Sequence, residues 1–228
     1  MPFTPLQLSL PIILASFLAH GTESAPSRDA SVTSSASMPS QTPKNNDTAR
    51  ATASNDPRVL FAQGQAALQR GDLHEAELDF RAVIAADPRA GSAYANLGVI
   101  AMRRKEWDHA LTLLQKASAL QPKMSGIRLN IGLVQFRRAD YAAAIAPLST
   151  VLRDQPDSRQ ARYLLGLCQV FTEHYADAVA TLEPLWAQQS ADVMYLYTLD
   201  IAAQNSGRHD LDEKALAQMI QIGSTTAE

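Results

Sequence analysis

Two stretches of the sequence, "ANLGVIAMRRKEWDHAL" at residues 95–111 and "LNIGLVQFRRADYAAAI" at residues 129–145, follow one plan. Asparagine, glycine, a pair of arginines, an aromatic residue, alanine and an aliphatic residue return in both at the same offsets. The chain therefore contains a repeated structural unit, whose length is the interval from residue 95 to residue 129.

The same period aligns four consecutive copies in five columns. These columns are Gly64, Gly98, Gly132 and Gly166; Ala76, Ala110, Ala144 and Ala178; Phe80, Leu114, Leu148 and Leu182; Leu73, Trp107, Tyr141 and Tyr175; and Pro88, Pro122 and Pro156, which Ser190 breaks. Glycine inside a helix costs about 1 kcal/mol, so its return at one place needs a packing reason. Small glycine and alanine columns let two antiparallel helices approach closely. The proline column ends each second helix.

On these columns the chain resembles the tetratricopeptide repeat (TPR) family, in which each unit is a helix–turn–helix of matching length. The resemblance covers nearly all of residues 57–192, with repeats at about 57–90, 91–124, 125–158 and 159–192. It implies an all-α, right-handed superhelical solenoid.

Residues 193–222 are expected to form a degenerate fifth helix pair, followed by a tail at 223–228. In strict phase, Asp200 and Asp212 would fall in the glycine and alanine columns. Burying two carboxylates there is costly. A register shifted by three residues, which puts Ala203 and Ala215 in these columns, is therefore the preferred prediction.

The N-terminus has a different character from the repeats. Residues 6–19 are apolar and uncharged, and residues 19–21 offer a cleavage site, so residues 1–21 are expected to be a signal peptide. The start "MPFTP" lacks the usual positive charge, which leaves an uncleaved membrane anchor as the alternative. Residues 22–55 are rich in Ser, Thr, Ala and Pro, which is typical of a disordered linker. The expected location is the periplasm or the secreted fraction.

Composition argues against several classes of function. The net charge of −3 over 228 residues gives no general drive toward nucleic acid or an anionic membrane. Cys168 is the single cysteine, which excludes an intramolecular disulfide and a cysteine-based metal cluster. Its column holds apolar residues, among them Ile100 and Val134, so the thiol is expected to be buried. With no phosphate-binding loop or catalytic motif, we expect no enzymatic activity, cofactor or metal.

The resemblance also implies a binding groove, which the first helix of each repeat would line. The expected groove residues are Asn96, Arg103, Leu129, Asn130, Leu133, Phe136, Arg137, Tyr163 and Phe171, together with Leu164, Leu167 and Val170 in the fourth repeat.

Two pairs within this set suggest how a peptide would be held. Asn96 and Asn130 share one repeat position, and an amide can pair with a peptide backbone. The alternatives are that they form a polar wall of the groove or bond a neighbouring helix. Arg103 and Arg137 form a basic pair suited to an acidic segment, the alternative being solvated helix ends.

The apolar residues Leu129, Leu133 and Phe136 would contact a partner's apolar side chains or pack the next repeat. The sequence thus predicts a non-catalytic scaffold that binds a protein or peptide. The alternative is a membrane-tethered assembly or secretion accessory factor. The oligomeric state and the partner's identity are not encoded in the pattern.

Overall fold

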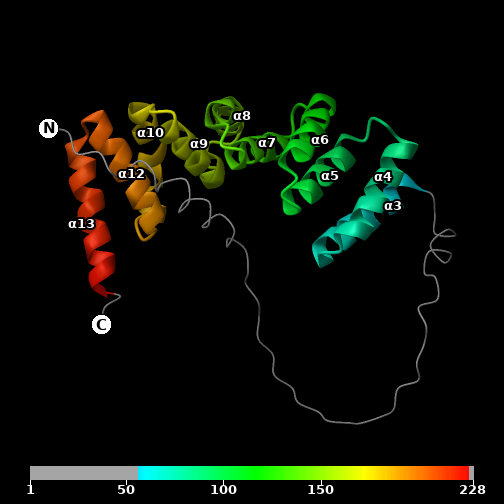
Figure 1. The fold of residues 1–228 in the computed structure, drawn as a ribbon, viewed down its shortest axis with the longest axis horizontal. Helices are drawn as coiled ribbons and strands as arrows, with labels where there is room; N and C mark the ends of the chain where they lie inside the picture. The colour runs from blue at the N-terminus through cyan, green and yellow to red at the C-terminus, as the bar shows by residue number, and fades with distance from the viewer. Residues whose placement is uncertain (1–55, 226–228) are drawn as a thin grey trace, which may run out of the picture. The chain divides into compact units, whose positions relative to one another are not determined.

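The structure is a computed structural model that describes residues 56–225. All regular structure within this range is helical, which confirms the all-α prediction. Figure 1 shows antiparallel helix pairs that follow one another in a row. Residues 1–21 and 22–55, for which a signal or anchor segment and a linker are predicted, lie outside the described residues.

Each pair consists of a first helix and a second helix. The pairs are α3 (Pro57–Arg70) with α4 (Leu73–Ala86), α5 (Gly91–Arg103) with α6 (Trp107–Leu120), α7 (Ser125–Arg137) with α8 (Tyr141–Asp154), α9 (Arg159–Phe171) with α10 (Tyr175–Leu182), and α12 (Val193–Ser206) with α13 (His209–Thr225). A 3₁₀ turn, η1 (Glu183–Leu185), and the short helix α11 (Trp186–Gln189) follow α10.

The link between the two helices of a pair has the same conformation in all five pairs. Its central residue has positive φ each time; these residues are Gly71, Lys105, Ala139, Glu173 and Gly207, with φ between 61° and 84°. The next residue donates its N–H to a carbonyl in the last turn of the first helix in the Schellman pattern, as from Asp72 to Ala67 at 3.0 Å. This bond satisfies a carbonyl at the helix end and turns the chain back on itself.

The glycine column has the packing reason that the sequence analysis expects. A Cβ added at Gly98, Gly132 or Gly166 would lie only 2.4–2.7 Å from the leucine of the same repeat, for example 2.6 Å from Leu148 Cγ. The leucine side chain therefore lies directly over the backbone of the first helix. Because this leucine column is fully buried, each glycine serves to let a core side chain pack.

The last pair keeps the strict period, so the preferred three-residue shift is wrong. Gly207 has its positive φ at the position one full period after Glu173. Asp200 and Asp212 therefore occupy the small-residue columns, and Gln204 Nε2 bonds both carboxylates. Ala203 and Ala215 are fully buried, but they pack in different clusters, with Leu211 and with Leu199 respectively. The register of the last pair therefore follows the position of the turn, and the cost of burying two carboxylates does not shift it.

Proline acts at two kinds of place in the second helices. Each of α4, α6 and α8 ends two residues before the proline of its column. In the fourth repeat Pro184 lies earlier, and there the helix gives way to η1 and α11. Proline lacks the N–H that continues a helix, but this loss does not always end one, because Pro147 lies inside the continuous helix α8.

One column shows how neighbouring repeats bury each other. Ile100, Val134, Cys168 and Ala202 are all buried, whereas the equivalent Ala66 of α3 is exposed because no described repeat precedes it. The prediction that Cys168 is buried is confirmed. None of the helices between Pro57 and Thr225 is long and apolar enough to cross a bilayer.

Candidate peptide-binding surface

The first helices contact one another in succession, from α3 to α5, α7, α9 and α12. Equivalent positions of successive repeats consequently stand in a row. The fifth position of the first four repeats holds half-buried side chains, and these four residues are here called the first-helix row: Phe61, Ala95, Leu129 and Tyr163. Next to it lies Leu133, which is also half-buried. The row is apolar and partly open to solvent.

Asn96 and Asn130 lie beside this row, and both are half-buried. Asn96 Nδ2 donates to the carbonyl oxygen of Ser92 in its own helix at 3.0 Å. This bond uses one of the two N–H groups of the amide, and the carbonyl oxygen can still accept from a second donor. Asn96 thus makes a contact with a helix backbone, but with its own helix and not with a neighbouring one.

Arg103 and Arg137 occur at the ends of α5 and α7. Arg103 is exposed, and its Nη1 donates to the carbonyl of Leu68 in the preceding repeat at 2.9 Å. Arg137 is half-buried, and this burial holds the pKa of its guanidinium below its usual range. A charge in this setting gains more from an anionic partner than one in open water.

The adjacent arginines face a different direction. Arg104 Nη1 lies 2.6 Å from Glu77 Oε2, and Arg138 Nε lies 3.2 Å from Asp108 Oδ1. Each of these pairs joins a first helix to the second helix of the preceding repeat. In each pair of arginines, the second therefore ties two repeats together.

Phe136 and Phe171 are drawn into aromatic packing between the third and fourth repeats. Phe136 is only 6% exposed, and its ring centroid lies 5.4 Å from that of Tyr141. Tyr141 in turn stacks on Phe171 at 4.3 Å. Phe136 thus offers little free surface, whereas Phe171 remains half-buried.

The fourth repeat differs from the expected groove. Leu164, Leu167 and Val170 are buried, so the expectation that they line an open surface is wrong. Tyr163 stays half-buried, and burial raises the pKa of its hydroxyl to about 12. The predicted residues that keep open surface in this repeat are consequently Tyr163 and Phe171.

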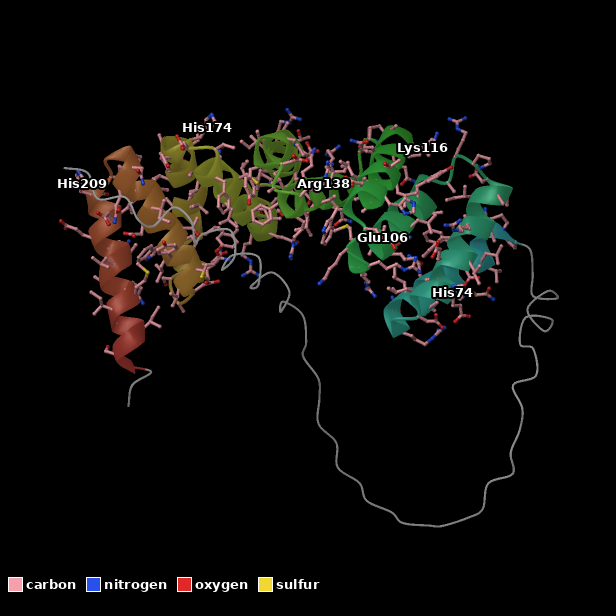
Figure 2. The ribbon with its side chains drawn as sticks, viewed as in Figure 1. His74, Glu106, Lys116, Arg138, His174 and His209 are labelled. Carbon is pink, nitrogen blue, oxygen red and sulfur yellow. The ribbon has the colours of Figure 1, made fainter. Side chains whose placement is uncertain are left out.

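The described residues offer no arrangement for metal chemistry. Between residues 56 and 225, no three His, Cys, Asp or Glu side chains are grouped so as to hold an ion. Figure 2 shows His74, His174 and His209 on different helix pairs, spread along the stack.

Sequence reasoning missed a hollow of about 250 Å³ between the second helices α4 and α6. Tyr94, Leu97 and Ile100 of α5 contribute to its walls. A sequence signal did exist: Ala101 stands where the next two repeats have Gln135 and Gln169.

Comparison with known proteins supports the repeat assignment. Two profiles described as tetratricopeptide repeat match residues 61–125 and 135–199. No curated protein sequence gives a significant match.

Solved structures share the fold at low sequence identity. One reported as "YrrB: a TPR protein with an unusual peptide-binding site" superposes with a TM-score of 0.69 at 15% identity, covering 77% of this chain and 90% of that one. A MamA protein gives a TM-score of 0.65 at 19% identity, covering 75% and 93%. MamA from Desulfovibrio magneticus RS-1 gives 0.66 at 17%, covering 75% and 97%.

Proposed function

Because the chain belongs to the tetratricopeptide repeat family, whose fold supports protein–protein interaction, we propose that its first helices bind an extended peptide segment of a partner protein without catalysis. The observation that carries this proposal is the first-helix row. Four half-buried side chains at one repeat position form a strip along successive helices. A rigid strip of this kind binds a peptide with little ordering cost on its own side.

The polar residues beside the row suggest how the peptide is oriented. Asn96 and Asn130 are spaced by one repeat, and an amide can donate to and accept from a peptide backbone without reading its side chains. Arg103 and Arg137 have the same spacing and add positive charge, which favours a peptide with an acidic residue or a chain terminus. Leu129 and Leu133 would contact the partner's apolar side chains.

A protein of similar fold supports peptide binding as the kind of function, but it does not indicate which residues take part. YrrB is described as having an unusual peptide-binding site, and its fold covers most of this chain. At 15% identity this likeness concerns the fold alone. The residues that contact a peptide here are therefore argued from this chain.

We propose in addition that the protein is exported, with residues 1–21 as the signal peptide. An uncleaved segment at residues 6–19 would instead tether the repeats to a membrane, as an assembly or secretion accessory factor requires. Mass spectrometry of the N-terminus of the native protein distinguishes these cases: a chain that begins after residue 21 indicates secretion, and an intact one indicates tethering.

Peptide binding is tested by selecting peptides from a random displayed library and measuring their affinity by fluorescence anisotropy. Asn96→Ala combined with Asn130→Ala should weaken binding of all selected peptides. Arg103→Gln combined with Arg137→Gln should lower the affinity for acidic peptides by roughly ten-fold or more. At high salt the loss should be smaller, because the ions screen the charges.

Lys116→Gln is the matched control, since this exposed lysine lies on the second helix α6 (Figure 2). All variants should melt near the wild-type temperature. A library that yields no binder, or affinities that neither double variant changes, would remove the proposal.

A further inference from the structure

We propose that the hollow between α4 and α6 is a second binding site, which receives a bulky apolar side chain of a partner protein that carries a carboxylate beside it. This site opens between two second helices, with its base on α5, and it uses no residue of the first-helix row. It is therefore a separate proposal from peptide binding by the first helices.

The floor of the hollow is apolar. Leu97, Ile100 and Ala101 of α5 form its base, with Ile84 of α4 and Leu113 of α6 at its sides. A dry cavity of roughly 150 Å³ can hold a benzene molecule. The 250 Å³ found here therefore has room for an aromatic ring and a few methylene groups.

The rim carries excess positive charge on the α4 side. Arg81 Nη2 and Arg104 Nη1 each lie 2.6 Å from the carboxylate of Glu77. Burial raises the pKa of Glu77, but hydrogen bonds from the two arginines outweigh it and lower the pKa overall. Two guanidinium groups thus share one carboxylate, and their remaining N–H groups can bind another anion. On the opposite side Glu106 Oε2 lies 3.4 Å from His109 Nδ1, so the carboxylate of this side already has a partner.

The other junctions between repeats show why this one is open. Ala101 has the same repeat position as Gln135 and Gln169, whose longer side chains bury their amide oxygens at the next two junctions. The last junction again has an alanine, Ala203, but there Val179 and Leu211 pack against it.

The counterparts of those two closing residues at the first junction are polar. Glu77 stands at the repeat position of Val179, and His109 stands at that of Leu211. A small residue in the floor and polar residues at the edges leave the space unfilled. The chain thus shows two ways to close such a junction, and the first junction uses neither.

The residues that close the other junctions of this chain provide the substitutions for the test. 4-Phenylbutyrate serves as the probe, and its neutral amide serves as the uncharged comparison. Binding to the full chain is followed by backbone amide shifts in two-dimensional NMR. We expect saturable shifts centred on Tyr94, Ala101 and Arg104, with the acid binding several-fold more tightly than the amide.

Ala101→Gln should fill the hollow as in the next two repeats and weaken the probe by roughly ten-fold or more. Ala119→Gln, at an exposed place on α6, is the matched control and should bind as wild type does. Arg81→Gln should lower the affinity for 4-phenylbutyrate and leave the affinity for its amide unchanged.

His109→Leu, which copies the last junction, is a second closing variant if Ala101→Gln perturbs the fold. Undiminished binding to a folded closing variant, or shifts centred elsewhere, would overturn the site. Equal affinity for acid and amide would overturn the assignment of a carboxylate. The Asn96 and Asn130 variants leave probe binding intact, so the two proposals fail separately.

Discussion

Asp200 of α12 faces Asp212 of α13 across the last helix pair, and Gln204 Nε2 lies 3.4 Å from both Asp200 oxygens and 3.2 Å from Asp212 Oδ1. Burial raises the pKa of Asp200 to about 7, and the hydrogen bond with Asp212 adds to this shift. The same hydrogen bond lowers the pKa of Asp212. Between the lowered pKa of Asp212 and the raised pKa of Asp200, the two carboxyl groups consequently hold one proton between them.

This pair predicts a loss of stability as the pH rises. The pKa of Asp200 is near 4 when the chain is unfolded and about 7 when it is folded, so between these values the folded state binds more protons. Its free energy of unfolding should therefore fall as pH increases through this window. Asp200→Asn should flatten the dependence and stabilise the protein most at about pH 8.

Urea unfolding at several pH values measures this effect. His209 lies close enough to help lower the pKa of Asp212, so the variant is compared with wild type at each pH. Asp177→Asn, at an exposed carboxylate on α10, is the control and should keep the wild-type slope. An unchanged slope in Asp200→Asn would contradict the shared proton.

Gly132 and Gly126 lie in the same helix and should respond oppositely to alanine. At Gly132 a Cβ would lie 2.6 Å from Leu148 Cγ, so Gly132→Ala should destabilise the fold by about 1–3 kcal/mol through overpacking. At Gly126 a Cβ meets nothing within 4 Å, and Gly126→Ala should be neutral or stabilise by up to about 1 kcal/mol. Chemical denaturation gives both values, and equal effects would contradict the packing argument.

Ala139 carries backbone strain that glycine should relieve. Its φ of 61° lies in the left-handed region, which costs a residue with a Cβ roughly 1–2 kcal/mol. Glycine also raises the conformational entropy of the unfolded chain, and this offsets part of the gain in stability. Ala139→Gly should therefore stabilise the protein by up to about 1 kcal/mol, while Ala143→Gly, within α8, should destabilise it. Thermal or urea unfolding measures both, and a loss of stability on Ala139→Gly would show that the turn is unstrained.

Cys168 should resist thiol reagents in the folded protein. Burial raises the pKa of its thiol to about 12, and the side chain is fully buried. Labelling with a chromogenic disulfide should be slow in buffer and fast in denaturant. Ala66→Cys in a Cys168→Ala background is the matched comparison, since the same column is exposed there; it should react quickly. Equal rates for the two cysteines in buffer would contradict the burial.

Much of the fold could be predicted from periodicity. The glycine and alanine columns predicted a close contact between the two helices of a repeat, and the structure shows that Leu148 fills the space that Gly132 leaves. Cys168 was predictable for the same reason, because its column is apolar in adjacent repeats. The last helix pair was predicted in the wrong register because the cost of two carboxylates was weighed alone. Their shared proton and the hydrogen bonds from Gln204 offset that cost. Neither feature can be recognised by aligning the repeats.

By itself, the sequence determined where the helices of the first three repeats begin, turn and end, because these limits depend on local chemistry that recurs in each of those repeats. Only the tertiary structure decided which surfaces remain open. Leu133 and Leu167 share a repeat position, yet the first is half-buried and the second is buried. Ala101 and Ala203 also share one, yet Ala101 lines a hollow and Ala203 lies in a closed cluster. The exposure of a residue depends on the side chains that neighbouring helices place against it. The residue's own position in the repeat specifies only its own side chain.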